Sequence, residues 1–370
     1  MGERRKFVAR ESWCGVNIRR VWRPDFPQMK SLGRFANAIW MILRWSLTAL
    51  TRKPDLIIVG TDPILSITAA GVWKLLRPRT RIAHWCFDLY PEAAVADGIL
   101  RPGGWFTTLL KPVLAHAYRS CDLLGDLGPC MSHRIRAHGS KGRQVTLTPW
   151  ALAEPALPVP INRTEREAIF GNSPLALLYS GSFGRAHSSD LILRLARRLE
   201  PHGARVAFSV RGNRADVLRR DAAAVPNIAF VPFTSQENLE ARLSAADIQI
   251  VSLREEWTGS VVPSKFFGAL AVGRPVLFAG SPESSIAHWI REHKVGWVLT
   301  ESSFDATSNE LLRYCREPHR LPQLFEHCHS VYKRHFSKRS VVDLWDAELR
   351  DLLGHSQKDF INAKELISKT

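Results

Sequence analysis

Short apolar runs alternate with stretches of helical periodicity along most of this chain, and they do so in two separate series. This alternation predicts βαβ units, in which buried parallel strands are covered by helices on both faces. In the first series, the expected strands are Leu56–Val59, Arg81–Phe87, Leu123–Leu127 and Val145–Leu147, and the expected helices are Ile67–Leu76 and Thr107–Arg119. In the second series, the expected strands are Leu175–Tyr179, Val206–Val210, Ile228–Val231, Ile248–Val251 and Val276–Phe278, and the expected helices are Ser189–Leu199, Ser235–Ala245 and Ser264–Ala271.

A proline-rich segment at 149–160, PWALAEPALPVP, separates the two series and breaks the alternation. The 370 residues exceed what one ordinary hydrophobic core supports. We therefore expect an α/β protein with two Rossmann-like, doubly wound domains at 1–150 and 161–335, joined by a linker at 151–160. Ligands of such sheets bind at the carboxyl ends of the strands, so a cleft is expected where the two domains meet.

The two ends of the chain do not fit this pattern. Gly15–Val21 predicts a strand, but no strand, glycine loop and helix precede it, although a doubly wound domain normally starts with that unit. The N-terminal domain is therefore expected to lack its first βαβ elements. Residues 355–370 are expected to form a polar tail.

The composition is that of a globular protein, with 45% hydrophobic and 23% charged residues. Six scattered cysteines, without a CxxC pair or a Cys/His pair at zinc spacing, favour reduced thiols in a cytosolic protein. The 13 histidines show no paired ligand spacing, so we expect neither a metal nor another cofactor. Met1–Lys6 is basic, but no apolar segment follows it, so no signal peptide is expected.

Positive charge is concentrated in the first half of the chain. Residues 1–150 hold 23 Lys and Arg against 10 Asp and Glu, a net charge of +13, whereas the remainder has 28 against 25, a net charge of +3. A basic half of this kind indicates contact with a polyanion, either nucleic acid or an anionic membrane surface. No helix-turn-helix, zinc or RNP signature supports nucleic acid.

The longest apolar run, Phe35–Leu50, is interrupted by Arg44 and is too short to span a bilayer. Its large apolar residues recur at helical spacing, which favours a helix packed in the core over a helix on a membrane surface. These residues are Ile39, Trp40, Leu43, Leu47 and Leu50.

The segment LLYSGSFGRAH at 177–187 joins an apolar strand to a helix through a turn with two glycines. Gly181 and Gly184 allow the backbone to approach a phosphate, and free amides and the helix dipole favour negative charge there. Arg185 adds a delocalised cation. The alternative is an ordinary βα turn that uses its glycines for geometry alone.

A second candidate segment is VVPSKFFGALAVGRPVLFAG at 261–280. Pro263 and Ser264 predict the start of a helix, and Lys265 lies in its first turn. A lysine there opposes the helix dipole unless an anion binds, which favours a phosphate ligand over a solvent-facing side chain.

FDLYPE at 87–92 directly follows an expected strand, so Asp88 and Glu92 should lie at the cleft. Carboxylates there bind acceptor hydroxyls or serve as a base, although Asp88 is equally suited to cap a helix. Arg214, in a turn after another strand, is a further candidate for ligand contact.

These segments, in this order, resemble the family 4 glycosyltransferases, which are retaining enzymes of the GT-B fold. The resemblance is closest to the bacterial branch that builds capsule, O-antigen and extracellular polysaccharide, and it covers roughly Gly15 to Leu353. The residues that carry it are Arg20–Pro24, Lys53–Asp55, Asp88–Glu92, Tyr179–Gly181, Gly184–His187, Pro263–Lys265 and Gly273–Val276.

The resemblance implies a nucleotide-sugar donor, usually a UDP-sugar, held by the second domain. It implies a polyprenyl-diphosphate-linked saccharide as acceptor, met by the first domain at the cytoplasmic face of the inner membrane. It also suggests that a helix at 336–354 crosses back onto the first domain. The implied site comprises Asp88 and Glu92 on the acceptor side and Gly181, Ser182, Gly184, Arg185, His187, Arg214, Ser264 and Lys265 on the donor side.

The sequence departs from the family pattern at two pairs of positions. Two glutamates that read the donor in many members fall at Ser260 and Gly268. The arginine and lysine that clamp the diphosphate fall near Ser182 and His187, so Arg185 and Lys265 are expected to replace them. These departures keep two alternatives open: a non-catalytic or truncated relative that binds a nucleotide or a partner, and a sugar-nucleotide epimerase of the same fold.

Overall fold

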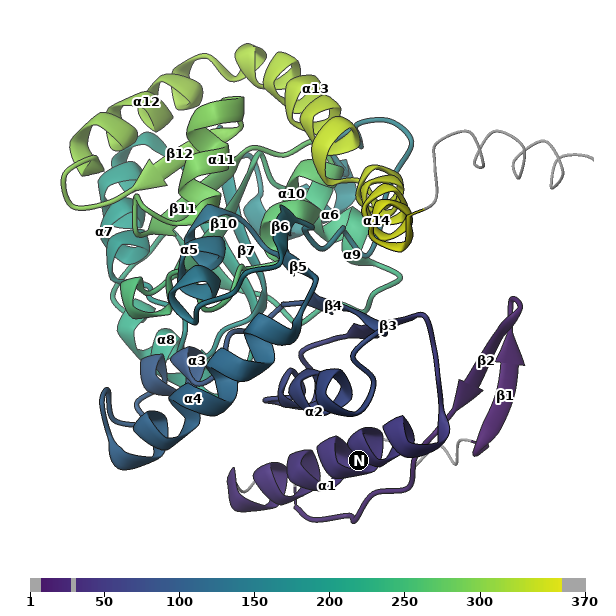
Figure 1. Ribbon diagram of the computed structural model, residues 1–370. Helices are drawn as coiled ribbons and strands as arrows, with labels where there is room; N and C mark the ends of the chain where they lie inside the picture. Colours follow the sequence, from purple (N-terminus) through teal and green to yellow (C-terminus); the bar gives the residue numbers. More distant parts are fainter. Residues whose placement is uncertain (1–7, 28–30, 355–370) are drawn as a thin grey trace, which may run out of the picture.

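The computed structural model describes residues 8–27 and 31–354, so the expected tail lies outside the described residues. Two parallel sheets form the framework (Figure 1). One sheet has four strands in the order β3-β4-β5-β6: β3 Leu56–Val59, β4 Arg81–Trp85, β5 Leu123–Asp126 and β6 Arg143–Thr146. The other has six strands in the order β12-β11-β10-β7-β8-β9: β7 Ala176–Ser182, β8 Arg205–Arg211, β9 Ile228–Phe230, β10 Ile248–Leu253, β11 Val276–Gly280 and β12 Gly296–Leu299.

The strands were predictable because strands covered on both faces read as continuous apolar runs. Every residue of β5 and β10 is buried, and so are four of the five residues of β11. The α/β class and the two parallel, Rossmann-like sheets expected from the sequence are confirmed. The exact domain boundaries stay a prediction.

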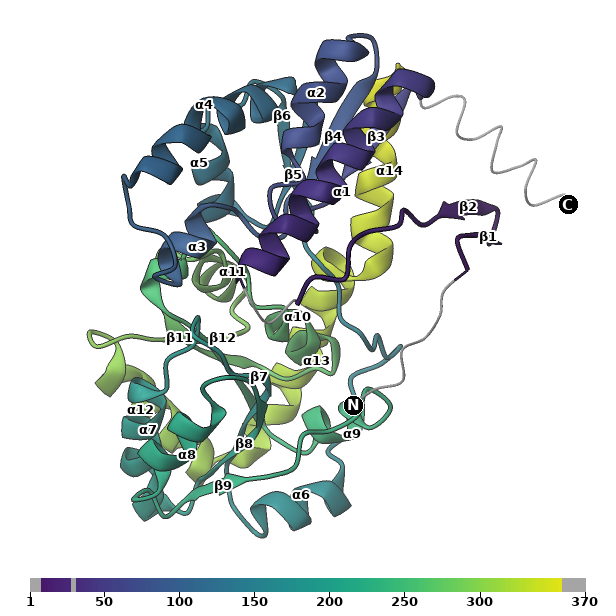
Figure 2. The same cartoon turned by 90° about the horizontal axis from the view of Figure 1, so that it is seen from below.

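Helices cover both sheets. Those of the first sheet are α1 Ser31–Thr51, α2 Thr68–Leu76, α3 Glu92–Ala96, α4 Trp105–Ser120 and α5 Pro129–Ala137. Those that follow the linker are α6 Arg163–Phe170, α7 Asp190–Leu199, α8 Ala215–Ala222, α9 Leu239–Ser244, α10 Lys265–Ala271, α11 Ser285–His293, α12 Phe304–Arg316 and α13 Leu321–Val331. Figure 2 shows the last helix, α14 Lys338–Leu353, lying beside the four-stranded sheet. Its Val341 and Trp345 pack there against Ala83, Leu123 and Leu147.

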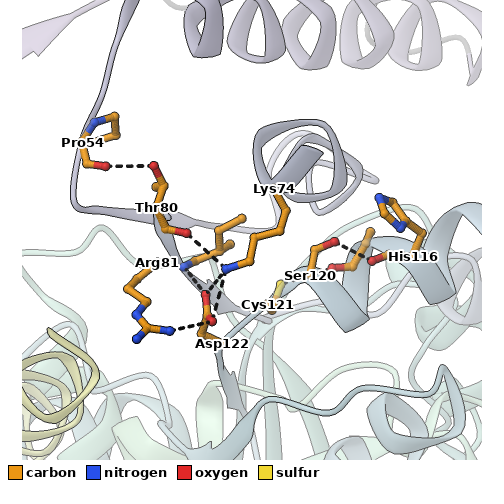
Figure 3. A network of polar contacts seen from close by, with 10 residues as sticks. Pro54, Lys74, Thr80, Arg81, His116, Ser120, Cys121 and Asp122 are labelled. Carbon is orange, nitrogen blue, oxygen red and sulfur yellow. Dashed lines mark hydrogen bonds and ion pairs between the residues drawn. The ribbon is translucent and has the colours of Figure 1, made fainter. Parts of the chain in front are cut away.

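A partly buried carboxylate, that of Asp122, holds together the amino ends of two strands of the first sheet (Figure 3). Asp122 accepts hydrogen bonds from the Ile82 amide at 2.8 Å and from the Lys74 ammonium at 2.9 Å. Arg81 lies 3.3 Å from the same carboxylate. This network fixes β4 and β5 from one end, which leaves their carboxyl ends available for a ligand.

The N-terminal segment differs from expectation. Instead of one strand at Gly15–Val21, it forms an antiparallel hairpin of β1 Arg10–Trp13 and β2 Val16–Arg19. Cys14 and Gly15 make its two-residue turn, with φ of 48° and 78°. Positive φ at both turn positions matches the twist of a two-residue hairpin, which is why the chain reverses there.

The prediction that the apolar face of Phe35–Leu50 packs in the core is wrong. The segment is helical, as α1, but Leu43, Leu47 and Leu50 are each more than half exposed. Small residues, Ala38 and Ala49 among them, form the buried side instead. They let α1 approach α2 closely, and the large residues are left on the outside. No helix of the described residues is long and apolar enough to cross a membrane.

Candidate active site

A cleft of about 670 Å³ lies between the two sheets, where the carboxyl ends of their strands face one another. One wall follows β4, and it includes Phe87 and Asp88. The opposite wall comes from the end of β7 and the start of α10. The residues there are Ser180, Gly181, Ser182, Ser264 and Lys265. The structure thus brings together candidates from three separate segments of the sequence.

Lys265 is the unsatisfied charge of this cleft. Burial lowers the pKa of its ammonium to about 8. Among the described residues, no group forms a hydrogen bond or an ion pair with the ammonium. Its nitrogen lies over the Tyr179 ring, 5.2 Å from the ring centroid. A partly buried cation without a carboxylate is poised to receive an anion.

Gly181 makes room for this lysine. Its φ is +131°, and a Cβ there would lie 2.6 Å from Lys265 Cε. A side chain at position 181 would therefore strain the backbone and displace the lysine. Gly184 has ordinary φ, and a Cβ there would meet only Asn213 Oδ1, at 3.4 Å. The first glycine of the turn is required by the site, whereas the second is not required by this geometry.

Ser264 holds the N-cap position of α10, but its side chain accepts no capping hydrogen bond. The expectation of a serine cap is therefore wrong, since the residue adopts helical angles (φ −62°, ψ −17°) and does not turn its hydroxyl back onto the helix. Its side chain is exposed to the cleft, as is that of Ser182 on β7. Both hydroxyls are free to contact a ligand.

Asp88 faces the cleft from the first sheet. Burial raises the pKa of its carboxyl, and the charge of Asp62 adds to that effect. No cation of the described residues forms an ion pair with it. A carboxylate with a raised pKa is a stronger base than an ordinary aspartate. Placed across the cleft from a lysine, it is suited to accept a hydrogen bond or a proton from an acceptor hydroxyl.

Glu92 does not join Asp88 in the cleft. Its Oε1 lies 2.7 Å from His138 Nε2, and the His138 ring stacks on Tyr118 with the centroids 4.9 Å apart. This pairing draws the carboxylate toward α5, so the predicted partnership of Asp88 with Glu92 is not formed. The contact ties the segment after Asp88 to the rest of the domain.

His187 and Arg214 line a smaller neighbouring cavity of about 230 Å³. His187 Nδ1 lies 2.7 Å from the Ser252 carbonyl oxygen. Burial lowers the pKa of His187 to about 4, and the charge of Lys265 adds to the effect. The imidazole is therefore neutral near pH 7, where Nδ1 donates to Ser252 and Nε2 is left as an acceptor.

Arg185 reaches away from Lys265. Its guanidinium lies 3.4 Å from the Asp97 carboxylate, just beyond α3, and the side chain is largely exposed. The sequence predicted that both cations would hold one phosphate site, but here Arg185 pairs with a carboxylate of the first domain. Its charge is already compensated, whereas that of Lys265 is not.

The cleft also contains residues outside the expected site, although Arg211 belongs to the turn of residues 211–214 that the sequence indicates as ligand-facing. Arg211 stacks over the Phe233 ring, with the guanidinium carbon 4.2 Å from the centroid, and both line the cleft. Trp150 and Leu152, from the expected linker, also line it. The sequence signal for this pair is an arginine at the end of one strand, Arg211, and an aromatic residue shortly after the next strand, Phe233.

The positions of the absent glutamates differ in their surroundings. Ser260 is fully buried, and its carbonyl accepts a hydrogen bond from the Leu89 amide at 2.8 Å. Gly268 lines the cleft, where a Cβ would have only Leu243 within 4 Å. Among the described residues, no group of three or more His, Cys, Asp or Glu side chains could hold a metal ion.

The chain is similar to other proteins both in sequence and in fold. No protein-family model matches the chain. A Pseudomonas aeruginosa protein named "Probable glycosyltransferase WbjE" is 25% identical over 325 residues, which cover 84% of this chain and 78% of that protein.

Among solved structures, sucrose-phosphate synthase from Thermosynechococcus elongatus matches with a TM-score of 0.68 and 15% identity, over 95% of this chain and 87% of that one. Anabaena HepE, solved in complex with UDP-glucose, matches with a TM-score of 0.61 and 12% identity, over 87% and 84%. The fold is that of the GT-B glycosyltransferases. Together with the named relative, it supports a glycosyltransferase.

Proposed function

We propose that this chain transfers a sugar from a nucleotide-sugar donor, a UDP-sugar, to a lipid-linked saccharide in the synthesis of cell-surface polysaccharide. The observation that carries the proposal is the uncompensated ammonium of Lys265 beside Gly181, opposite Asp88 in one cleft. A diphosphate supplies the missing anion, and a carboxylate across the cleft meets an acceptor hydroxyl. HepE, which shares the fold, was solved with UDP-glucose.

In this proposal, the donor diphosphate lies against Lys265 and the hydroxyls of Ser182 and Ser264. As the bond to the sugar breaks, negative charge grows on the departing phosphate, and the lysine stabilises it. Asp88 holds the acceptor hydroxyl toward the sugar and takes its proton while the hydroxyl oxygen bonds to the anomeric carbon and the nucleoside diphosphate leaves. The product keeps the donor's anomeric configuration, as the family resemblance implies.

The acceptor is proposed to be a polyprenyl-diphosphate-linked saccharide at the cytoplasmic face of the inner membrane. The +13 charge of residues 1–150 supports an anionic lipid surface as a partner of this half of the chain. The family 4 assignment and the capsule or O-antigen branch belong to the same proposal.

Uridine diphosphate is expected to raise the melting temperature of the full chain. A ligand that binds only the folded state at about 100 times its dissociation constant stabilises it by about 2.7 kcal/mol. Thermal unfolding with UDP, UMP and uridine measures this, and the shift should fall in that order because each step removes a phosphate. Absence of a shift with any nucleoside diphosphate would contradict a donor site.

Transfer distinguishes an enzyme from the non-catalytic alternative. Labelled UDP-sugars are incubated with the chain and a lipid extract, and incorporation into lipid is counted. A chain that binds UDP but turns over no donor in such a panel is a nucleotide-binding relative and not an enzyme.

Arg185→Ala is expected to weaken UDP binding by less than about tenfold, which is less than the loss at Lys265. The reason is that Arg185 is exposed and already paired with Asp97, so its removal deletes a screened charge. Asp97→Asn frees the guanidinium and should leave UDP affinity unchanged or tighter. Calorimetric titration of both variants measures this. Weaker binding in Asp97→Asn would show instead that the pair holds the donor loop in its binding geometry.

A further inference from the structure

Three neighbouring helices of the first domain contain no carboxylate. Helices α1, α2 and α4 pack side by side, as both ribbon views show (Figures 1 and 2). Not one Asp or Glu occurs in their sequences, although Arg34, Arg44, Lys74, Lys111 and Arg119 do. Surfaces of soluble proteins normally mix both signs of charge, so this layer is built to face negative charge.

Helix α4 also carries a stripe of exposed apolar side chains. Trp105, Leu109 and Val113 are 80%, 63% and 47% exposed. Their spacing of four residues places them on one side of the helix, opposite the buried Leu114 and Tyr118. A contiguous apolar stripe on an otherwise soluble surface marks a contact with a membrane or a partner.

Free cations flank this stripe. Arg101 precedes α4 and Arg119 lies near its end, and both are exposed. None of the ion pairs of the described residues involves them. Lys74 on α2 differs, because Asp122 already compensates it at 2.9 Å (Figure 3). The two exposed cations and the apolar stripe together form what we call the α4 face: Ile99, Arg101, Trp105, Leu109, Val113 and Arg119.

The α4 face follows the acceptor wall of the cleft along the chain. The chain runs from Asp88 in the cleft through α3 to Asp97, and α4 begins shortly afterwards at Trp105. Asp97 in turn contacts Arg185, which follows the glycine turn of the donor side. A short segment of chain therefore joins the acceptor carboxylate of the cleft to the α4 face.

We propose that the α4 face is the part of this chain that docks on an anionic lipid bilayer. The inference rests on the proposed function for its lipid-linked acceptor and adds the docking surface. Trp105, Leu109 and Val113 enter the interface between headgroups and acyl chains, where an amphipathic helix lies in the membrane plane. The flanking cations contact anionic headgroups.

The charges favour a bilayer over other occupants. A second copy of the chain would bring two carboxylate-free, basic faces together, and like charges repel at such an interface. A nucleic acid backbone would satisfy the cations but would leave the Trp105–Val113 stripe in water. A bilayer satisfies both features at once.

Flotation of the full chain with vesicles tests the docking surface. The parent is expected to bind phosphatidylcholine vesicles that contain phosphatidylglycerol much more strongly than pure phosphatidylcholine, and to lose only part of the binding as salt rises. The double variant Trp105→Ser/Leu109→Ser should reduce partitioning about tenfold or more, since two large apolar side chains no longer leave water. Arg101→Gln/Arg119→Gln should remove most of the salt-sensitive part.

Leu157→Ser is the matched control, because Leu157 is 75% exposed but lies near the linker. It should bind vesicles like the parent, and Trp105→Phe should retain most of the binding. Equal vesicle binding by the Trp105→Ser/Leu109→Ser variant and the parent would overturn the proposal. So would loss of a parent dimer in that variant, measured by sedimentation velocity without lipid, or preferential binding to duplex DNA.

The UDP-induced rise in melting temperature separates this inference from the proposed function. Each variant of the α4 face should keep that rise. If UDP raises the melting temperature but the chain does not bind anionic vesicles, the docking inference is wrong and the donor site is still supported. If the chain binds anionic vesicles but UDP does not change its melting temperature, the donor site is contradicted and the docking surface is still supported.

Discussion

Lys265→Met is expected to weaken UDP binding about ten- to a hundredfold. The substitution keeps an unbranched side chain beside Gly181 but removes the partly buried ammonium, which forms no hydrogen bond or ion pair among the described residues. A charge-assisted contact is worth about 1.5–3 kcal/mol, and about 1.4 kcal/mol changes a binding constant tenfold. Lys265→Arg should recover only part of the loss, because its planar fork does not replace a compact ammonium.

The same variant is expected to be more stable than the parent when no ligand is bound. Burial lowers the pKa of Lys265 from 10.5 to about 8, so the folded state disfavours its charged form. Each pKa unit corresponds to about 1.4 kcal/mol, so a fall from 10.5 to about 8 gives a penalty of about 3.5 kcal/mol near pH 7. Removal of the charge removes that penalty. Binding and stability should therefore change in opposite directions.

The sign of the pH dependence follows from this lowered pKa. Between about pH 8 and 10.5 the unfolded state binds more protons at Lys265 than the folded state does, so the stability of the parent rises with pH there. The advantage of Lys265→Met should be full below pH 8 and vanish near pH 10.5. UDP affinity of the parent should fall above pH 8, as the ammonium loses its proton, and that of the variant should not.

Calorimetric titration and urea unfolding from pH 6 to about 10 measure both effects. Lys333→Met is the control, because Lys333 is exposed and lies outside the cleft. If Lys265→Met binds UDP as tightly as the parent and unfolds like it, the diphosphate site lies elsewhere and the glycine turn is geometry alone.

Much of the framework could be predicted because its strands are buried on both faces. The sequence predicts a strand at Ile248–Val251, and in the structure this strand continues two residues further, to Leu253. Helices such as α8 and α12 were not predicted. Their sequences, ADVLRRDA and FDATSNELLRYCR, are mostly polar with a narrow apolar stripe, so packing against the sheet decides their conformation more than local pattern does.

The failure at α1 has a different cause. Its periodicity correctly indicated a helix, but periodicity does not say which face a helix buries. Ala38 and Ala49 face inward because they allow close approach, and Leu43 and Leu47 are left exposed. Hydrophobic spacing predicts an amphipathic element, and only the neighbouring elements determine its partner.

The site residues that could be predicted are those that lie at the carboxyl ends of parallel strands, where ligands of such sheets bind. Asp88 follows β4, Gly181 lies at the end of β7 and Lys265 begins α10, and the carboxyl edges of the two sheets face a common cleft. Side-chain pairings between distant segments could not be predicted. Glu92 meets His138, and Arg185 meets Asp97, only because the chain folds around them. Those two contacts decide that neither Glu92 nor Arg185 shares the cleft with Lys265.

Asp88→Asn is expected to reduce sugar transfer about 10²- to 10⁴-fold, the range associated with loss of a group that handles a proton in the transition state. Asparagine keeps the size and hydrogen-bonding capacity of the side chain, so the fold and UDP affinity should be unchanged. Transfer from a labelled UDP-sugar to lipid-linked acceptor, with UDP titration beside it, measures both quantities.

The pH profile and a matched variant distinguish a catalytic role for Asp88 from a structural one. Burial and Asp62 raise the pKa of Asp88, so transfer by the parent should fall as pH drops through that raised pKa, at a higher pH than for an ordinary aspartate. Asp62→Asn removes the neighbouring charge and should move this acid limb to lower pH without abolishing transfer. Asp88→Glu should retain partial activity if position alone is disturbed. Full transfer by Asp88→Asn would show that the acceptor is activated by another group, and the carboxylate wall of the cleft would then serve only to bind it.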